Sequence, residues 1–343
     1  MSKRILKLEK STWIQAYQIR NFELGVLQKK TPWILSKHIN CYYDTKAMGI
    51  FNHCMPEKRY FTKCKALIVQ RFRYDKSFLS LDILNFVQWA KNLIDGGWYI
   101  MGYYDEYYIP ETVSYQYRHF RHTMLIYGYD DESQLFYAMG YTSDRKYRSH
   151  CLTYSEFISS IGVDFDRKNE PYIKRDIERI EFDAFRLNPE CDFKFDLSQV
   201  YTSLLDYINC EDSGYRHQRG LKYGFDCERE FVNYIKAQKG EYLDERYSRL
   251  FMELKELMVR RLEYLAGEQV VSKDILPEYK TICAQQKTIH LLFIKYNLTM
   301  DERIIDRLVE KMSGIIEAEK NILPRITDEI YACLVKKHNE EYL

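Results

Sequence analysis

The sequence predicts an α+β protein, in which an antiparallel sheet with helices is followed by a helical C-terminal region. Two apolar runs at 122–130 and 134–141 flank the polar stretch DDESQ, which indicates a hairpin. Apolar residues three or four positions apart predict an amphipathic helix within 77–97. After about residue 242 the pattern is helical throughout. These observations favour a sheet-containing domain over 1–200 and an α-helical bundle over 201–343, packed on it.

The composition excludes several classes of protein. Of the 343 residues, 46% are apolar and 29% are charged, which argues against disorder. Lys and Arg number 51 against 50 Asp and Glu, so a general nucleic-acid binder is not expected. No apolar run is long enough for a signal peptide or a membrane span. Nine cysteines occur without a CxxC pair, which favours reduced thiols, a cytoplasmic location and no metal site.

The elements of the first half follow from local signals. The helix within 77–97 should stop at Gly96 and Gly97, and WYIMGYY should follow it as a strand. Thr153 and Glu156 have the spacing of a capping box, so a helix should start in LTYSEFISSI. The segment PYIKRDIERIEFDAFRLNP is less regular and indicates one or two strands and a loop.

The second half contains a series of helical segments. Helices are predicted in DLSQVYTSLLDYINC, in YGFDCEREFVNYIKAQ and in the segments that follow residue 242. Pro277 and Pro324 stand where the first turn of a helix would tolerate proline. One apolar stripe consists of Leu250, Leu254, Leu257, Arg261 and Leu265, so that it includes one arginine. The helical region could serve as a lid, a homodimer surface or a dock for a partner.

Cys41 is the candidate nucleophile. It lies in WILSKHINCYYDTKAMGIF, before residues that could form a helix. A cysteine at a helix N-terminus has its thiolate stabilised by unpaired N–H groups, which can also form half of an oxyanion hole. The alternative is a small buried apolar residue, the usual role of a free cysteine.

His122 is the candidate base. A histidine that opens a strand is often a polar core residue, but a cysteine at a helix start followed by such a histidine is the chain order of papain-like sites. His122 would take the thiol proton and later act as an acid, and a carboxylate or amide would have to hold its ring. His119, three residues earlier, is the rival base.

Three stretches carry a family resemblance: HINCYYDTKAMGIF, GGWYIMGYYDEYYIP and HFRHTMLIYGYDDESQLFYAMGY. They resemble the butirosin biosynthesis protein H N-terminal family, a branch of the bacteriocin-processing, papain-like cysteine peptidase superfamily. The matching residues are Cys41, Gly97, Asp105, Tyr107, Tyr108, His122, Gly128, Tyr129 and Asp130. The match covers about 35–165 and implies a papain-like catalytic domain over 1–200.

The resemblance implies acyl transfer. An acyl group would move from a carrier-protein thioester to an amine through an acyl-Cys41 intermediate, in the biosynthesis of a secondary metabolite such as a peptide-like antibiotic. The implied partners are an acyl or peptidyl carrier protein and a small amine acceptor, with no nucleic acid and no membrane. No cofactor is implied, because phosphopantetheine of the carrier holds the substrate and the thioester is already activated. The absence of a phosphate-binding loop in the sequence agrees with this.

The chain departs from the family pattern at two places. Peptidases of the superfamily have a glutamine six residues before the nucleophile, where this chain has Leu35. Asn40, Ser36 or a backbone N–H could then be the oxyanion donor. The third member of the triad is either Asp105 or Asp144, and the sequence does not decide between them. Asp130 is predicted to form a turn instead.

Substrate contacts are predicted more loosely. Tyr42, Tyr107 and Tyr108 could line an aromatic cleft, although the 31 tyrosines also fit a bias in composition together with strand propensity. One group of basic residues consists of Lys63, Lys65, Arg71 and Arg73. This group could bind an acidic carrier protein, or it could be an ordinary solvent-exposed face. Two alternatives to the transferase remain: a cysteine peptidase or thioesterase that uses water, and a non-catalytic scaffold that binds the carrier.

Overall fold

The computed structural model describes two separately packed units. The described residues are 2–10, 12–27, 31–45, 49–53, 66–75, 83–161, 179–213 and 220–341. The sheet unit comprises Met1–Thr12, Tyr17–Lys29 and Phe61–Cys191. The helical unit comprises Trp13–Ala16, Lys30–Tyr60 and Asp192–Leu343. The contacts therefore divide the chain differently from the predicted segments 1–200 and 201–343, because residues 30–60 belong with the C-terminal helices.

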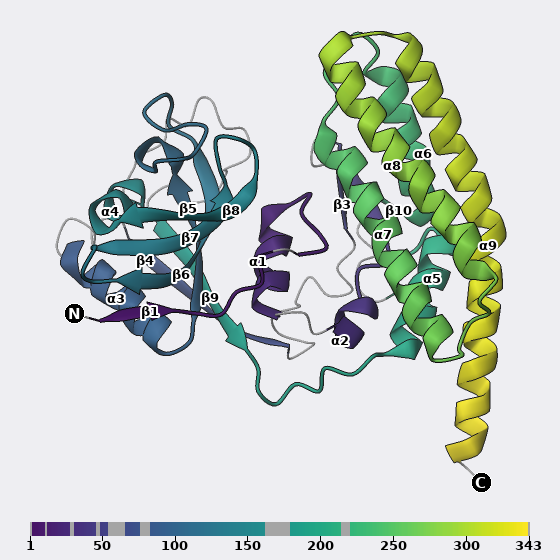
Figure 1. Cartoon of the computed structure of the whole chain (residues 1–343), viewed down its shortest axis with the longest axis horizontal. Helices are drawn as coiled ribbons and strands as arrows, with labels where there is room; N and C mark the ends of the chain where they lie inside the picture. The colour runs from purple at the N-terminus through teal and green to yellow at the C-terminus, as the bar shows by residue number, and fades with distance from the viewer. Residues whose placement is uncertain are drawn as a thin grey trace. The chain divides into compact units, whose positions relative to one another are not determined.

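The sheet unit is built on an antiparallel sheet (Figure 1). Within the described residues it has seven strands in the order β4-β9-β5-β6-β7-β8, with β1 paired to β6. The strands are β1 Lys3–Ile5, β4 Leu67–Asp75, β5 Tyr99–Asp105, β6 Arg121–Asp130, β7 Leu135–Tyr141, β8 Tyr147–Thr153 and β9 Arg179–Leu187. The helices are α1 Gln18–Leu27, α3 Ile83–Asp95, α4 Tyr154–Ile161 and the 3₁₀ turn η2 Glu106–Tyr108. The predicted helix, the strand after it and the hairpin β6-β7 are confirmed.

The core of the sheet unit follows from the predicted apolar patterns. Phe86, Ala90 and Ile94 of α3 are buried with Ile126 of β6 and Phe157 of α4 in one apolar cluster. Burial of the Phe and Ile side chains among them contributes roughly 1.5–3 kcal/mol each. The sheet and α3 therefore hold the ends of β5 and β6 in place.

The predicted capping box at the start of α4 is confirmed. The backbone N–H of Glu156 donates to Thr153 Oγ1 at 3.1 Å, and the Thr153 N–H donates to Glu156 Oε2 at 2.7 Å. Each side chain thus satisfies a backbone donor that the first turn of the helix leaves unpaired. The sequence signal and the observed contacts agree residue by residue.

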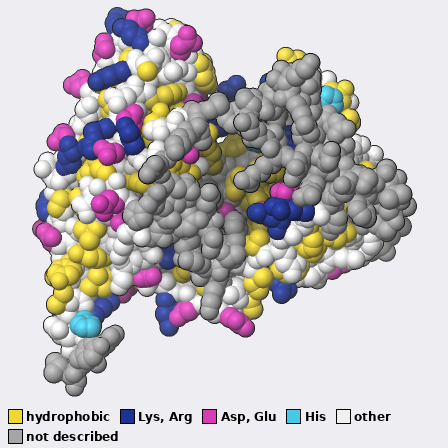
Figure 2. All heavy atoms as spheres, turned by 180° about the vertical axis from the view of Figure 1, so that it is seen from behind, with side chains coloured by type: hydrophobic (Ala, Val, Ile, Leu, Met, Phe, Trp, Pro, Cys, Tyr) yellow, Lys and Arg dark blue, Asp and Glu magenta, His cyan; other side chains and the backbone are white. Residues whose placement is uncertain are grey.

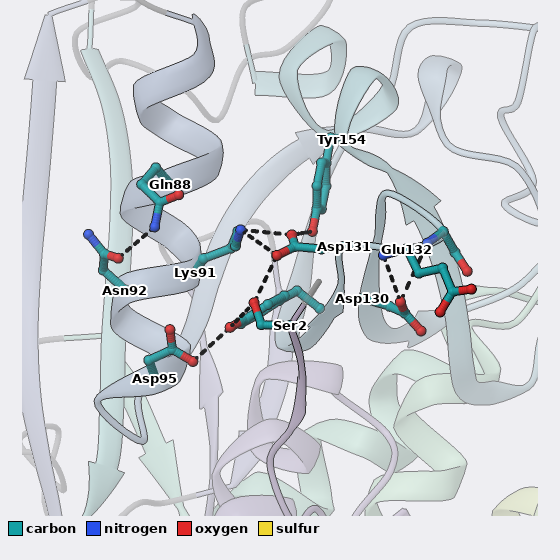
Figure 3. A network of polar contacts seen from close by, with 11 residues as sticks. Ser2, Gln88, Lys91, Asn92, Asp95, Asp130, Asp131, Glu132 and Tyr154 are labelled. Atoms are coloured by element: carbon teal, nitrogen blue, oxygen red, sulfur yellow. Dashed lines mark hydrogen bonds and ion pairs between the residues drawn. The ribbon is translucent and has the colours of Figure 1, made fainter.

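A polar network fastens the N-terminal strand of the sheet unit (Figure 3). Asp131 accepts hydrogen bonds from Ser2 Oγ at 2.8 Å and Tyr154 Oη at 2.8 Å, and it forms an ion pair with Lys91 of α3 at 2.7 Å. The Lys91 ammonium is the largest cause that lowers the pKa of the Asp131 carboxyl. This carboxylate therefore joins Ser2, the residue before β1, to α3 and α4 at the β6-β7 turn.

The helical unit contains a small sheet and a set of helices (Figure 1). Its strands, in the order β10-β2-β3, are β2 Cys41–Asp44, β3 Ile50–His53 and β10 Leu221–Tyr223. Its helices are α2 Thr31–Leu35, α5 Leu197–Asn209, α6 Gly224–Ala237, α7 Glu245–Gly267, α8 Ile275–Thr299 and α9 Arg303–Glu341. α7 packs against α8 and α8 against α9. The prediction of a helical C-terminal region is confirmed.

Proline behaves as predicted in one helix and not in another. Pro277 lies in the first turn of α8, as expected. The prediction that Pro324 begins a helix is wrong, because it lies inside α9. Ile322, Leu323 and Ile326 on either side of it are buried. An internal proline costs about 3 kcal/mol, and we attribute the unbroken helix to packing of these side chains, which offsets that cost.

Buried charges are a second feature of the helical unit. Lys255 Nζ lies 2.7 Å from Glu228 Oε1, 2.6 Å from Glu319 Oε2 and 3.1 Å from Tyr207 Oη, with both carboxyl side chains at most 1% exposed. Arg261, also buried, donates to the carbonyl oxygens of Leu35 at 2.6 Å and Lys37 at 2.7 Å. The two cations thus hold α5, α6, α7, α9 and the segment before β2 together.

The surface of the chain carries charges of both signs. On the face shown in Figure 2, basic and acidic side chains are intermixed. In the parts of the chain that the structure describes, no helix combines the length and the apolar character needed to cross a bilayer.

Candidate functional site

Cys41 does not open a helix, so that part of the prediction is wrong. It is the first residue of β2, which pairs with β3 and β10. Tyr42 and Tyr43 follow it, and aromatic residues favour a strand. Without a helix N-terminus, a helix dipole cannot stabilise the thiolate. The Cys41 side chain is fully buried, which matches the alternative of a small apolar core residue.

Asn40, the predicted oxyanion donor, braces the chain around Cys41. Its Oδ1 accepts from the N–H groups of Cys41 at 2.8 Å and Gly224 at 3.0 Å. Its Nδ2 donates to the Glu211 carbonyl at 3.0 Å. The Cys41 N–H, which could have served an oxyanion, is therefore already bonded. The side chain of Ser36, the other candidate, donates to the Trp33 carbonyl at 2.7 Å.

His122 stands at the start of β6 and is held by a glutamate. Its Nδ1 lies 2.7 Å from Glu106 Oε1. The imidazole is 37% exposed, whereas the Glu106 side chain is only 10% exposed. An ionised carboxylate can only accept, so Nδ1 carries the hydrogen and the Nε2 lone pair is left to receive a proton. This is the arrangement of an imidazole–carboxylate general base.

A second dyad uses the carboxylate one residue before Glu106 and the histidine three residues before His122. His119 Nδ1 lies 2.6 Å from Asp105 Oδ2, and the Asp105 side chain is fully buried. The other carboxylate oxygen accepts from the backbone N–H groups of Tyr107 at 3.1 Å and Phe120 at 3.0 Å. Asp105 thus caps the η2 turn and orients His119 at the same time.

The prediction that Asp105 or Asp144 orients His122 is corrected by these contacts. Glu106 binds His122, because the tight turn after β5 directs two consecutive carboxylates to two different histidines. Asp144 instead accepts from Thr142 Oγ1 at 2.6 Å and pairs with Arg148 at 3.4 Å. Glu106 was not predicted from the sequence, although the doublet Asp105-Glu106 and the two histidines of HFRH could have indicated paired dyads.

The predicted tyrosines lie in two places. Tyr107 stacks on the His119 ring with centroids 4.3 Å apart, and the Tyr108 centroid is 5.9 Å from the same ring. Both therefore belong to the surroundings of the second dyad. Tyr42 lies in β2 of the helical unit, with its ring 6.5 Å from that of Tyr223.

The predicted site residues are divided between the units. His122, Asp105, Asp144, Tyr107 and Tyr108 belong to the sheet unit; Asn40, Cys41 and Tyr42 belong to the helical unit. The pairing of Cys41 with His122 therefore stays a prediction from the sequence. The dyads, by contrast, are complete within the sheet unit.

The basic group is in part neutralised. Arg71 pairs with Asp183 at 2.6 Å and Arg73 with Glu181 at 2.9 Å, across β4 and β9. Lys63 and Lys65 lie outside the described residues. Among the residues described, no three His, Cys, Asp or Glu side chains lie together in a way that could hold a metal ion.

Comparison with protein-family models and with curated proteins identified no relative of this chain. No protein-family model matches the chain, and no curated protein matches it. What the site can do therefore follows from its side chains. It contains two partly exposed imidazoles, each held at Nδ1 by a buried carboxylate, which is the geometry that proton transfer by histidine requires.

Proposed function

We propose that the chain is an ATP-independent acyltransferase that forms an amide from a carrier-protein thioester and an amine, with His122 as the general base. The observation that carries the proposal is the 2.7 Å contact between His122 Nδ1 and Glu106 Oε1, which leaves Nε2 for proton transfer. The acyl substrate, the phosphopantetheine-bearing carrier and the role in secondary metabolism come from the resemblance of the sequence motifs. The papain-like form of the core is part of the same proposal.

The chemistry needs a base for a definite reason. The amine nitrogen attacks the carbonyl carbon, a C–N bond forms, the C–S bond breaks, and the nitrogen must lose a proton. His122 Nε2 takes that proton, while Glu106 stabilises the imidazolium that results. In the two-step version predicted from the sequence, Cys41 Sγ first attacks the thioester carbonyl and displaces the carrier thiol. The amine then attacks the acyl-Cys41 thioester and displaces the Cys41 thiol.

The test uses an acylated carrier protein with and without a diamine acceptor. We expect the unchanged chain to form the amide, and His122→Gln to lower the rate by about 10²–10⁴-fold, the usual contribution of a general base. His338→Gln, which removes an exposed histidine in the last turn of α9, is the matched control and should leave the rate unchanged. Mass spectrometry of products and protein gives the readout.

Each other outcome points to a different function. Free acid as the sole product would make the chain a thioesterase or peptidase. Binding of the carrier with neither product nor adduct would make it a scaffold. An acyl adduct that is absent in Cys41→Ser would support the two-step route. Equal rates for His122→Gln and the unchanged chain would overturn the role of His122.

A further inference from the structure

We infer that His119 is a second catalytic residue, the general acid that protonates the leaving thiolate while His122 removes the proton from the amine. This inference rests on the proposed function and names the other half of its proton transfer. It comes from the juxtaposition of two dyads whose carboxylates, Asp105 and Glu106, are consecutive residues at the turn after β5.

The two dyads are built alike. In each, a carboxylate that is at most 10% exposed contacts Nδ1 of a histidine within 2.7 Å. In each, the imidazole is partly exposed, by 51% for His119 and 37% for His122. Both rings therefore have a fixed Nδ1 and an Nε2 directed away from the carboxylate. A reaction that needs a donor and an acceptor of protons can use one ring for each.

The His119 ring has a structural contact, because its Nδ1 is the hydrogen-bond partner of Oδ2 on the buried Asp105, but that contact does not use Nε2. Asp105 already closes the turn through the N–H groups of Tyr107 and Phe120. The Glu106 N–H also donates to the Phe120 carbonyl at 2.9 Å, and the Gln116 N–H donates to the Tyr107 carbonyl at 3.0 Å. Backbone contacts therefore hold the segment between β5 and β6 in place. The partly exposed His119 imidazole adds a proton-transfer group to this segment.

The aromatic surroundings assign the roles. Tyr107 lies against the face of the His119 ring, with an angle of 28° between the ring planes. Aromatic faces attract cationic groups, so this ring suits the residue that begins the step as an imidazolium. His122 instead has Phe120 as its aromatic neighbour, with centroids 5.3 Å apart and the planes tilted by 53°.

The step balances in atoms and charge. The amine gives one proton to His122 Nε2 as its nitrogen bonds to the acyl carbon. The electron pair of the C–S bond leaves with sulfur, and His119 Nε2–H gives a proton to that thiolate. The products are an amide and a free thiol, and the two imidazoles return to their starting states by exchange with water. No oxidant, reductant or further co-reactant is required.

The experiment compares two leaving groups. An alkyl thioester of the carrier type needs its thiolate protonated, whereas an aryl thioester with a thiol of low pKa leaves without help. We expect His119→Gln to lower the rate with the alkyl thioester by about 10²-fold or more, and with the aryl thioester by only a few-fold. His122→Gln should lose rate with both substrates, and the control His338→Gln with neither.

The possible outcomes distinguish failure of the acid role of His119 from failure of the proposed acyltransferase function. If the unchanged chain forms no amide from either thioester, the proposed function fails and the inference with it. If it forms the amide and His119→Gln loses the same factor with both thioesters, the acid role alone is overturned. Thermal unfolding of His119→Gln and of a second variant, His119→Asn, identifies a loss of fold; a folded variant with the full rate on the alkyl thioester also overturns the inference.

Discussion

Both units pair carboxylates with cationic or basic side chains, but the two regions differ in how much of each pair reaches solvent. In the sheet unit the partners of Asp105 and Glu106 are histidines exposed by 51% and 37%. In the helical unit the partner of Glu228 and Glu319 is Lys255, which is only 2% exposed. The carboxylates are buried in both cases, so the difference lies in the second partner.

Under the proposed function, this difference separates the pairs that transfer protons from the pairs that are structural. A proton-transfer group must meet its substrate, so an imidazole with an accessible Nε2 fits catalysis. An ammonium enclosed by carboxylates and a tyrosine cannot meet a substrate. It instead imposes one arrangement on the helices that contribute its partners, because separating buried charges is costly. Variants of the buried Arg261 and Glu228 in the helical unit, and of Glu106 in the sheet unit, should show the contrast directly.

The largest effect on stability should come from Arg261→Met. Within the described residues the guanidinium has no carboxylate partner; it donates to the buried carbonyls of Leu35 and Lys37, and burial lowers its pKa to about 10. The variant leaves these carbonyls without their donor, at about 1–3 kcal/mol each. We expect the free energy of unfolding of the helical unit to fall by roughly 2–5 kcal/mol in urea titrations.

Arg260→Met is the matched control for that variant. Arg260 is exposed on the same helix, with its guanidinium 5.2 Å from the Trp13 ring. Its loss should cost less than about 1 kcal/mol. If the two variants had equal unfolding free energies, the buried arginine would not be a structural element of the helical unit.

Glu228→Gln should change how stability depends on pH. Burial is the largest cause that raises the pKa of Glu228, to about 7 from the ordinary 4.5, and Lys255 opposes it. Because the folded state then holds a proton that the unfolded chain releases, stability falls as pH rises from about 5 to about 7 and levels off above that. The variant, which is neutral at every pH, should lack this fall of up to about 3 kcal/mol.

Unfolding in urea at pH 5, 6, 7 and 8 measures this dependence. Glu230→Gln, two residues along α6, removes a carboxylate that pairs with Lys222 nearer the surface. It should keep the pH dependence of the unchanged chain. A Glu228→Gln variant with the original slope between pH 5 and pH 7 would show that another group carries the proton.

Among the variants of the buried carboxylates and of Arg261, the smallest effect on stability should come from Glu106→Gln. The amide oxygen can still accept from His122 Nδ1–H, and the partner is 37% exposed, so the free energy of unfolding should change by less than about 1 kcal/mol. Amide formation should nevertheless slow strongly, since the imidazolium loses its counter-charge. Glu111→Gln, an exposed partner of Arg148, should alter neither quantity. A large loss of stability without loss of rate would place Glu106 among the structural pairs.

The sequence predicted those helices, strands and caps that are determined by residues close together in the chain. The stripe of α3, the β6-β7 hairpin and the Thr153–Glu156 box all depend on neighbours along the chain, and the structure confirms them. The helix predicted after Cys41 is wrong because the conformation of this stretch depends on pairing with a strand that is distant in the sequence. The stretch pairs with β10, whose register joins Tyr42 to Tyr223.

The candidate site was predictable in type but not in its pairing. Histidine and carboxylates at the ends of β5 and β6 were visible in the sequence, yet consecutive acidic residues gave no sign of which one would reach His122. That choice depends on the η2 turn, where Asp105 Oδ1 accepts the Tyr107 N–H. The division of Cys41 and His122 between two units depends on contacts between segments far apart in the chain.

The place of β9 in the sheet has a consequence for how the chain is made. β9 lies between β4 and β5, although it is translated after both of them. Until residues 179–187 leave the ribosome, β4 and the facing edge of β5 lack their shared neighbour, and their open backbone groups can pair with other chains. Nascent chains halted before this strand should therefore be the ones that bind chaperones and aggregate.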